Sequence, residues 1–292
     1  MRIGLLTDST CDLSVEELSN KNIEIVPLSV HFDDNVYLDR VELSAEEFYE
    51  LLDKKDIYPR TSQPSVGIFL EKYKKMSESY DAIISIHISS KLSGTFESAR
   101  LAKSQLSEIK IEVINSKSTS LAQGFLTLLA AKMIKKDYSF EEIVNNIKKI
   151  INSFDIYFSV NDLSFLQKGG RIGKVQALLG GILNFNPIIK LDTNEGILLP
   201  VEKIRGSKKT EKRVIELVSK SLDDEKYAWI GIVKGNRDIS NFTNNLLSFL
   251  DNQKYLNYKK RQARISPVLA CHAGPSLFGI IIFKGEILKE FF

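Results

Sequence analysis

Apolar residues along the chain alternate between two spacings. Short runs rich in β-branched residues, such as residues 82–88 (AIISIHI), are typical of buried strands and end at Ser, Gly or Pro. Between such runs, apolar residues recur every three or four positions, as in Phe96, Ala99 and Ala102, which is typical of helices. This alternation predicts an α/β fold.

Three of the expected helices have a defined start, in which Ser is followed three residues later by Glu. The pairs are Ser14 with Glu17, Ser44 with Glu47, and Ser139 with Glu142. In this arrangement, the capping box, the side chain of each residue accepts a hydrogen bond from the backbone N–H of the other. We therefore predict that helices begin at these three serines.

The remaining elements follow from the same pattern. Strands are expected over residues 3–7, 23–32, 82–88, 111–115, 156–160, 187–191, 197–201, 228–233, 265–271 and 277–283. Further helices are expected after Pro64, over residues 96–106, 121–134 and 175–183, just before Gly169, and from residues 207 and 239. The new strand at residue 156 follows two long helices, so we expect two domains, residues 1–155 and 156–292.

Composition excludes several classes of protein. A chain of 292 residues with 43% hydrophobic and 26% charged residues is typical of a folded protein near the size at which two domains form. Its 40 basic and 37 acidic residues are too balanced for a nucleic-acid-coating surface. Apolar runs are too short for a secretory signal or a membrane span, and the two cysteines show no metal-site spacing. We expect a cytoplasmic protein without a metal or other cofactor.

The clearest candidate site lies between the strand at residues 82–88 and the next helix. Ser93, Gly94 and Thr95 occupy the loop that opens this helix. A helix N-terminus carries unpaired N–H groups and positive potential, so a carboxylate there gains hydrogen bonds without a full opposing charge. The alternative is that Ser93 or Thr95 only caps the helix.

Two other hydroxyl-rich segments are weaker candidates. In TDSTCDLS, Asp8 and Asp12 are more typical of turn and cap residues than of an acid/base or metal pair. In YPRTSQPS, two prolines hold a loop in which Thr61 could donate to an anion, although the loop could equally be a plain connection.

The segment LQKGGRIGK at residues 166–174 resembles a phosphate-binding loop only superficially. The P-loop spacing requires a Gly where Lys168 stands and a Ser or Thr where Val175 stands. Arg171 instead follows a pair of glycines at the opening of the next expected helix, an unfavourable place for a cation. We interpret Arg171 as a contact for a carboxylate or phosphate of a ligand or partner, the alternative being a solvated side chain.

The histidines divide into two groups. His272 lies in CHAGPS, at the expected end of a strand and next to turn residues, where it could donate to a carboxylate or act as a base. His31 and His87 fall inside expected strands and are interpreted as structural.

Five of these segments in order, LTDSTCDL, RTSQPS, SSKLSGTFESA, LSFLQKGGRI and HAGPS, resemble the DegV family of bacterial fatty-acid-binding proteins. The resemblance covers essentially the whole chain. It implies two α/β domains, the N-terminal one with a mainly parallel sheet and the C-terminal one with a mixed sheet, with a long-chain fatty acid held between them. It also implies a partner, a separate fatty-acid kinase that phosphorylates the carboxylate with ATP for phospholipid synthesis.

Carried over by position, the resemblance implies that Thr61, Ser93 and His272 contact the carboxylate, with Thr95 as a neighbouring candidate. Arg171 would serve coupling to the kinase or docking on it. The segment containing Ala177, Leu178, Gly180 and Gly181 mixes small and large apolar residues and could line the acyl tunnel, although core packing predicts the same pattern.

Two other functions remain open at this level. A serine hydrolase acting on acyl esters would use Ser93 as nucleophile and His272 as base, but the chain lacks the GxSxG elbow. A docking module would use a basic run formed by Lys203, Arg205, Lys208, Lys209, Lys212 and Arg213. That run could also face the kinase or simply be solvated.

Overall fold

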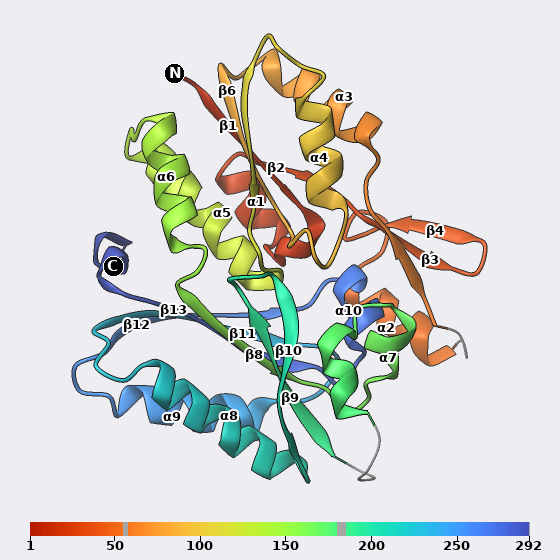
Figure 1. Cartoon of the computed structure of the whole chain (residues 1–292), viewed down its shortest axis with the longest axis vertical. Coiled ribbons are helices and arrows are strands. Elements are labelled where there is room, and N and C mark those ends of the chain that lie inside the picture. The colour runs from red at the N-terminus through yellow and green to blue at the C-terminus, as the bar shows by residue number, and fades with distance from the viewer. Residues whose placement is uncertain (55–57, 180–184, 292) are drawn as a thin grey trace. The chain divides into compact units, whose positions relative to one another are not determined.

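A computed structural model of the chain describes residues 1–54, 58–179 and 185–291 (Figure 1). The chain divides into two compact units. The first unit contains Met1–Asn152, Asn194–Gly196 and Ser266–Cys271, and the second contains Ser153–Thr193, Ile197–Ile265 and His272–Phe292. Both units combine helices with strands, which confirms the predicted α/β class.

The first unit is built on a four-stranded parallel sheet in the order β2-β1-β6-β7. Its strands are β1 (Ile3–Asp8), β2 (Ile23–Val26), β6 (Ala82–His87) and β7 (Lys110–Asn115). Every residue of β6 is buried, as expected for a strand covered on both faces. One face packs against α3 (Val66–Ser77) and α4 (Thr95–Lys103), through side chains that include Phe69, Tyr73 and Ala99.

Four more helices and a small sheet also belong to the first unit. The helices are α1 (Val15–Asn20), which follows the 3₁₀ turn η1 (Ser9–Cys11), α2 (Ala45–Lys54), α5 (Ser120–Lys135) and α6 (Phe140–Ile150). The small sheet is antiparallel, in the order β4-β3-β5, and α2 lies between β4 and β5 in the sequence. Its strands are β3 (Ser29–Phe32), β4 (Asn35–Leu38) and β5 (Arg60–Ser62).

The small sheet corrects one prediction from the sequence. Residues 23–32 form two strands in different sheets, β2 and β3, instead of one. Pro27 lies between them, and a proline cannot donate to a strand ladder. The three predicted capping boxes, at Ser14, Ser44 and Ser139, are confirmed, because each glutamate accepts from the serine N–H and each serine hydroxyl accepts from the glutamate N–H.

The second unit contains a six-stranded sheet in the order β10-β9-β8-β13-β11-β12. Only β11 and β12 pair in parallel and the other neighbours are antiparallel, so the predicted mixed sheet is confirmed. The strands are β8 (Phe154–Ser159), β9 (Asn186–Asp192), β10 (Ile197–Ile204), β11 (Tyr227–Lys234), β12 (Asn257–Arg264) and β13 (Phe278–Lys284).

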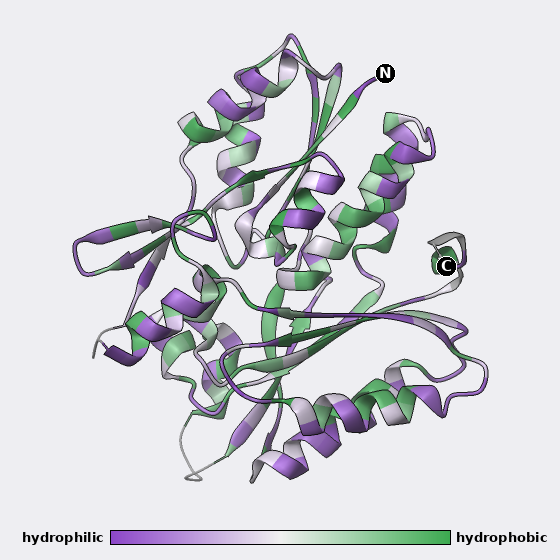
Figure 2. Cartoon of the chain, turned by 180° about the vertical axis from the view of Figure 1, so that it is seen from behind, coloured by the Kyte–Doolittle hydropathy of each residue, from purple (hydrophilic) through white to green (hydrophobic). Residues whose placement is uncertain are grey.

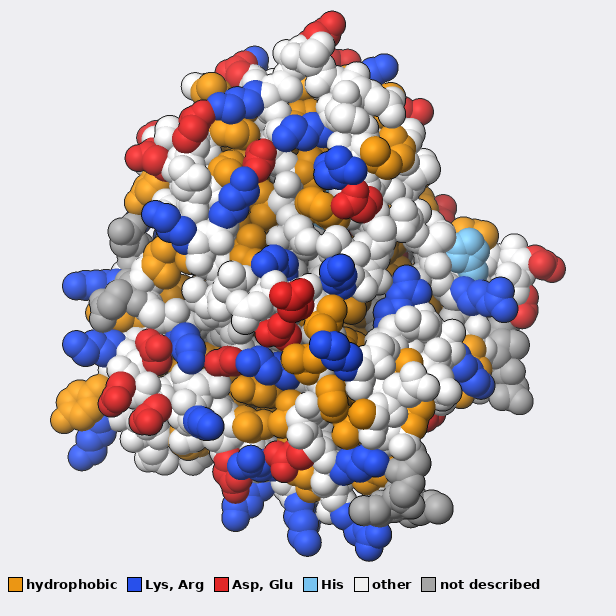
Figure 3. Space-filling model, in the orientation of Figure 1, with side chains coloured by type: hydrophobic (Ala, Val, Ile, Leu, Met, Phe, Trp, Pro, Cys, Tyr) orange, Lys and Arg blue, Asp and Glu red, His pale blue; other side chains and the backbone are white. Residues whose placement is uncertain are grey.

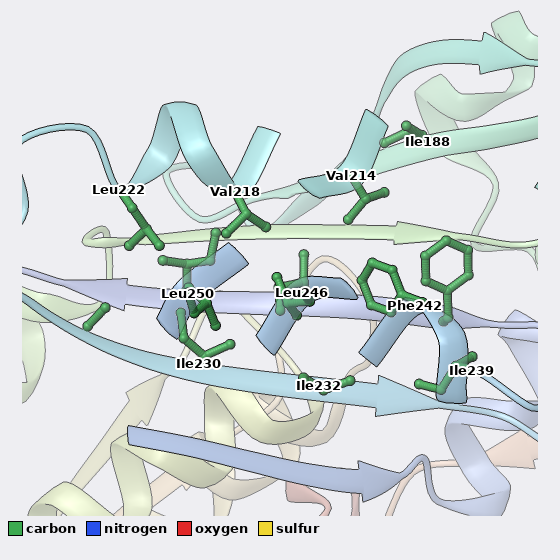
Figure 4. Close-up of a cluster of buried hydrophobic side chains, with 14 residues drawn as sticks. Ile188, Val214, Val218, Leu222, Ile230, Ile232, Ile239, Phe242, Leu246 and Leu250 are labelled. Atoms are coloured by element: carbon green, nitrogen blue, oxygen red, sulfur yellow. The ribbon is translucent and has the colours of Figure 1, made fainter. Parts of the chain in front are cut away.

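Two helices, α8 (Ser207–Ser221) and α9 (Ser240–Asp251), cover one face of this sheet. Figure 4 shows Val214 and Val218 of α8, and Leu222 just after it, on the side of the cluster opposite Ile230 and Ile232 of β11. Phe242, Leu246 and Leu250 of α9 lie in the same cluster. In Figure 2 the strands are mostly green and these helices alternate between green and purple, as expected for elements that bury one face. The buried cluster is therefore apolar throughout.

The C-terminal part of the second unit departs from prediction in three places. The strand expected over residues 265–271 is wrong, because residues Pro267–Ala273 form a short helix, α10, which begins in the first unit and ends in the second. The strand β12 was not predicted, since its sequence NYKKRQAR has no apolar alternation. The helix expected over residues 175–183 is wrong in its described part, which is the 3₁₀ segment η2 (Gly173–Leu178), and residues 180–183 lie outside the described residues. Two short segments, α7 (Ser164–Lys168) and η3 (Glu286–Phe291), complete the list.

Candidate functional site

The loop between β6 and α4 carries the predicted anion site of the first unit. Ser93 is half-buried and Thr95 is fully buried, and their hydroxyl groups lie 2.8 Å apart in a hydrogen bond. The N–H of Thr95 also donates to the Ser93 hydroxyl, at 3.3 Å. The Ser93 hydroxyl can therefore accept a hydrogen bond from Thr95 and donate one to a ligand, whereas Thr95 is buried and does not reach the surface.

The Gln63 side chain leaves no room for a side chain at Gly94, which lies between these two residues. Its φ of −75° is open to any residue, but a methyl group on its Cα would lie 2.0 Å from Oε1 of Gln63. The Gln63 amide nitrogen donates to the Ser98 hydroxyl at 3.0 Å. The close approach at Gly94 is thus made by Gln63, two residues after Thr61, and it connects the segment after β5 to the start of α4.

Thr61 itself is half-buried in β5, where it pairs with Val30 of β3. The loop that leads from β6 to Ser93 is held by two side-chain hydrogen bonds. The Ser89 hydroxyl donates to the carbonyl of Gly196 at 2.7 Å, and the amide of Asn115 donates to the Ser90 hydroxyl at 2.7 Å. Ser93 therefore stands on a loop whose preceding residues, Ser89 and Ser90, are fixed by side-chain bonds.

Beneath this loop, a buried polar network crosses the sheet. His87 bonds to Asp8 through Nδ1, at 3.0 Å, and to Ser85 through Nε2, at 2.6 Å, and Tyr73 donates to Ser85. Burial raises the pKa of Asp8, but the bonds from His87, Thr10 and the Ile88 N–H outweigh it and hold that pKa below its ordinary value. Asp8 and His87 are completely buried, so this network supports the loop from inside and does not face a ligand.

Asp8 also caps the turn η1, since its side chain accepts from the N–H of Thr10. This confirms the interpretation of Asp8 as a turn and cap residue. His87 is structural, as predicted, and His31 bonds to the Ser62 hydroxyl through Nε2 at 2.8 Å. In the described parts of the chain, no cluster of three or more His, Cys, Asp or Glu side chains could hold a metal ion.

In the second unit, His272 occupies the last turn of α10 instead of a strand end. It lies against the glycine that follows α7, because a methyl group on Gly169 would be 2.2 Å from Nδ1 of His272. Burial, reinforced by the positive charge of Arg171, lowers the pKa of His272 to about 4. At neutral pH the ring is uncharged, so it acts as a neutral donor and is a weak base.

Arg171 is half-buried beside this histidine. One guanidinium nitrogen donates to the carbonyl of Gly169 at 2.7 Å, which folds the side chain back over the glycine pair. Burial lowers the pKa of Arg171, but an arginine remains charged at neutral pH. Gly170 has a φ of +71°, a conformation that favours glycine, so this pair of glycines turns the chain and makes room for His272.

The predicted tunnel residues are only partly described. Ala177 is exposed and Leu178 is buried within η2, while Gly180 and Gly181 lie outside the described residues. The next residue, Leu179, lines a pocket of about 280 Å³ together with Phe185 and Pro187, and the other lining residues include Asn161 and Gln167. Since this lining mixes polar and apolar groups, a role for the segment in holding an acyl chain stays a prediction.

The basic run after β10 is partly neutralised within the second unit. Arg213 pairs with Glu202 and Glu216, at 2.6 and 2.9 Å, and Lys203 lies over the ring of Phe185. Arg205, Lys208, Lys209 and Lys212 are exposed. Figure 3 shows Lys and Arg side chains intermixed with Asp and Glu, in keeping with the nearly balanced charge of the chain.

The structure thus places the predicted residues in two groups. Thr61, Ser93 and Thr95 belong to the first unit, where Gln63 links their loops, and Arg171 and His272 belong to the second, where both contact Gly169. The sequence analysis missed Gln63 and Gly169. Neither residue belongs to a motif of its own, and each only stands near a candidate residue in the sequence. Each acts through a contact with a residue that is distant along the chain.

Comparison with known proteins gives a consistent family. The model of the DegV family, described as an uncharacterised protein family, matches residues 2–285. Protein DegV of Bacillus subtilis is 34% identical over 281 residues, which cover 96% of this chain and 98% of that protein. Among the described residues, none of the helices has both the length and the apolar character needed to cross a membrane.

Solved structures agree with the sequence comparison. A DegV family protein from Thermus thermophilus, described by its fatty acid binding, has a TM-score of 0.90 at 29% identity, covering 98% of this chain and all of that one. DegV from Bacillus subtilis, described as a fatty acid binding protein, has a TM-score of 0.88 at 33% identity with the same coverage. A stearic-acid-binding protein from Eubacterium ventriosum has a TM-score of 0.87 at 29% identity, covering 97% of this chain and 98% of that one. On these grounds, the chain belongs to the DegV family.

Proposed function

We propose that this protein binds a long-chain fatty acid in the cytoplasm and presents its carboxylate to a separate ATP-dependent fatty-acid kinase. Thr61, Ser93 and His272 contact the carboxylate, and Thr95 supports Ser93. The observation that carries the proposal is the hydroxyl pair of Ser93 and Thr95 at the start of α4, 2.8 Å apart, in a fold shared with proteins described as binding fatty acids.

The head group is matched by dipoles and neutral donors. A carboxylate at the start of α4 accepts from the Ser93 hydroxyl and lies in the positive potential of the helix N-terminus. The imidazole of His272, uncharged because its pKa is about 4, adds a second donor without a full charge. This arrangement satisfies the acid without neutralising it, which leaves the carboxylate reactive toward a phosphate donor.

The acyl chain supplies most of the binding free energy. Each buried methylene contributes about 0.8 kcal/mol, so a long chain contributes on the order of 10 kcal/mol before the costs of association. The head group therefore sets the orientation of the acid more than the gross affinity. Loss of one head-group bond is expected to weaken binding without abolishing it.

The kinase step follows from this orientation. A carboxylate oxygen attacks the γ-phosphorus of ATP, the bond to ADP breaks, and an acyl phosphate forms for phospholipid synthesis. Arg171 is the residue we assign to coupling with the kinase, because its charge is held half-buried beside His272. The exposed basic run at Arg205, Lys208, Lys209 and Lys212 is a second surface for docking, which moderate salt would weaken while the lipid stays bound.

Organic extraction and mass spectrometry of the purified protein test the ligand class directly. A fatty acid is expected at about one equivalent. In Ser93→Ala, the dissociation constant for oleate should rise by about tenfold, the cost of a hydrogen bond to a charged group. The matched control is Ser90→Ala in the same loop, which should leave binding unchanged because the Ser90 hydroxyl accepts from Asn115. Equal oleate affinity in wild type and Ser93→Ala would contradict the head-group assignment.

A second experiment separates binding from coupling. Arg171→Ala should keep the lipid and lower acyl-phosphate formation by a purified fatty-acid kinase. Lys174→Ala, which removes an exposed cation three residues away, is the control and should support normal turnover. Equal acyl-phosphate formation by wild type and Arg171→Ala would exclude a role of Arg171 in coupling.

The serine hydrolase alternative needs a general base to take the serine proton, and His272 is poorly suited to that role. With a pKa of about 4, His272 has little tendency to take a proton from a serine at neutral pH. The hydroxyl of Ser93 is bonded to Thr95. Turnover of an acyl ester by the purified protein, abolished by Ser93→Ala, would reinstate this alternative.

A further inference from the structure

The N-terminus of α10 is held by two carboxylates from the beginning of the chain. The N–H of Ser266 donates to Oδ1 of Asp12 at 2.9 Å, and the N–H of Val268 donates to Oδ1 of Asp39 at 3.3 Å. Pro267 stands between them and has no N–H to offer. These two donors at the start of α10 thus end on carboxyl oxygens, which in their charged form also suit the positive end of a helix.

Strained backbone surrounds these carboxylates. Asp12, Arg40 and Ser120 all have left-handed φ values, of 52°, 62° and 57°. Ser120 donates its hydroxyl to the second oxygen of Asp12, and Arg40 directly follows Asp39. Left-handed residues other than glycine cost on the order of 1 kcal/mol each and persist only where surrounding contacts demand them. Three of them around one pair of carboxylates indicate that the placement of that pair is under constraint.

The two carboxylates are also expensive to bury. Asp12 is 3% exposed and Asp39 is 0% exposed. Burial raises the pKa of Asp39 to about 7, against bonds from Ser9 and Val268 and the charge of Arg40. Burial likewise raises the pKa of Asp12 to about 6, against Arg40, Ser120 and Ser266. In their charged form, carboxyls buried to this degree cost stability relative to neutral groups of the same shape.

Helix α10 carries a candidate ligand residue at its other end. His272 lies four positions after Val268, which is about one turn along the helix. A short helix moves as a rigid body, so bonds at its first turn determine where its last turn stands. The boundary between the two units falls between Cys271 and His272. The two carboxylates bond to Ser266 and Val268, which lie just before this boundary.

We propose that Asp12 and Asp39 are positioning residues, which fix the first turn of α10 and thereby set the orientation of His272 toward the bound acid. This inference rests on the proposed function for its ligand. The clamp formed by Asp12, Asp39 and the N–H groups of Ser266 and Val268 acts on binding through the helix and touches no ligand itself.

The pKa values of the groups around the clamp predict the charge of Asp12 and Asp39 between pH 5 and pH 8. The charge of Arg40 acts on both carboxyls, and the thiols of Cys11 and Cys271 respond to the charges of Asp12 and Asp39. Burial raises the pKa of Cys11 to about 12 and that of Cys271 well above its ordinary value. With pKa values of about 6 and about 7, Asp12 and Asp39 change charge in this interval.

Stability and binding should therefore respond in opposite directions to Asp39→Asn. A carboxyl whose folded pKa is raised stabilises the fold below its ordinary pKa and loses that contribution as pH rises through about 7. Replacing Asp39 by the neutral Asn removes this loss, so the melting temperature at pH 8 should stay equal or rise. The dissociation constant for oleate should rise by about tenfold, because the Val268 N–H loses a charged acceptor.

Asp12→Asn is the second variant, in case either substitution alone impairs folding, and it should behave in the same way. A residue with a purely structural role would lower the melting temperature and the affinity together. That outcome in both variants, or unchanged oleate affinity in both, would overturn the inference.

A double-mutant cycle with His272→Ala tests whether the clamp acts through this histidine. The tenfold loss from Asp39→Asn should disappear in the His272→Ala background, since the residue being positioned is gone. The matched control is Asp8→Asn, another buried carboxylate of the first unit, which bonds to His87 and not to α10. Its effect should be the same in both backgrounds. Independent, additive effects of Asp39→Asn and His272→Ala would overturn the inference.

A ligand-free measurement separates this inference from the proposed function. The imidazole resonances of His272, identified by their absence in His272→Ala, should shift in lipid-free Asp39→Asn and stay in place in Asp8→Asn. If wild type binds no oleate while these shifts occur, the proposed function fails and the clamp stands. If wild type binds oleate and the His272 resonances do not move, the clamp fails alone.

Discussion

The two units solve the problem of burying a sheet in different ways. The first encloses a polar network in which Asp8, His87 and Ser85 are completely buried and bonded to one another. The second encloses an apolar cluster in which Phe242, Phe278 and the aliphatic residues of α8 and α9 meet the sheet (Figure 4). Bonded polar interiors fix a single geometry, whereas apolar interiors give stability without direction. The first unit therefore adds to its apolar core a bonded polar network that fixes the geometry of nearby loops, whereas the buried cluster under α8 and α9 contributes stability alone.

The largest expected effect tests the apolar interior. Phe242→Ala should lower the free energy of unfolding of the second unit by about 4 kcal/mol, since it removes a buried aromatic side chain and leaves a cavity. The single tryptophan, Trp229, lies in β11 and reports this unit by fluorescence during denaturant unfolding. The loss should be the same at pH 5 and pH 8. A loss that changes with pH would show that charges contribute to this core.

The next effect tests the polar interior. His87→Leu should destabilise the first unit by about 3 kcal/mol, because it leaves the Asp8 carboxylate buried without its partner. Without His87, burial raises the pKa of Asp8, and a raised carboxyl pKa costs stability as pH rises. The destabilisation should therefore shrink between pH 7 and pH 4. Hydrogen exchange of amides in β1 and β6 measures it.

Asp8→Asn in the His87→Leu background is the control for this interpretation. A neutral amide is cheaper to bury than a carboxylate, so the double variant should recover part of the lost stability at pH 7. If the double variant is less stable than His87→Leu, the buried charge is not the cause of the loss.

A smaller effect tests the contact between loops in the first unit. Gly94→Ala should cost about 2 kcal/mol, since the new methyl group must displace the Gln63 side chain and its bond to Ser98. Gly67→Ala in α3 is the control, because only the Ser65 hydroxyl lies near, at 3.7 Å, and alanine favours a helix. Thermal unfolding of the two variants should shift in opposite directions. A Gly94→Ala protein as stable as wild type would mean that Gln63 moves without cost.

The smallest effect concerns helix starts. In the first unit, α1, α2 and α6 begin with capping boxes, whereas the N-cap residues of α8 and α9 in the second unit, Gly206 and Ile239, make no side-chain cap bond. Ser139→Ala should destabilise α6 by about 1 kcal/mol, as measured by hydrogen exchange of its first amides. No change would show that packing alone fixes this helix start.

Local pattern was sufficient for most of the fold. The uninterrupted apolar run of β6 predicted a strand covered on both faces, and the serine and glutamate pairs predicted three helix starts, because both depend on neighbours in sequence. The pattern did not predict β12, because an edge strand such as NYKKRQAR exposes its charged side chains and needs no apolar alternation.

The error at residues 265–271 has a specific cause. The segment ISPVLAC is apolar and partly β-branched, which is typical of a strand, but Pro267 is compatible with the first position of a helix. The acceptors that complete this helix start come from Asp12 and Asp39, more than two hundred residues earlier. No local pattern contains that information.

The same limit applies to the candidate site. The Ser93 hydroxyl at a helix start was predictable, because strand, loop and helix follow one another in the sequence. The position of Gln63 over Gly94, and of His272 against Gly169, depends on packing between distant segments. The depressed pKa of His272 depends on that burial, so its neutral state could not be predicted from its neighbours in the sequence.

The order in which the first unit is assembled has a consequence during synthesis. This unit contains Ser266–Cys271, so its structure is complete only after a ribosome has made residue 271. Until then, Asp12 and Asp39 lack the N–H groups of Ser266 and Val268 as partners. A nascent chain therefore finishes the fold of its N-terminal half only after most of the second unit has been made.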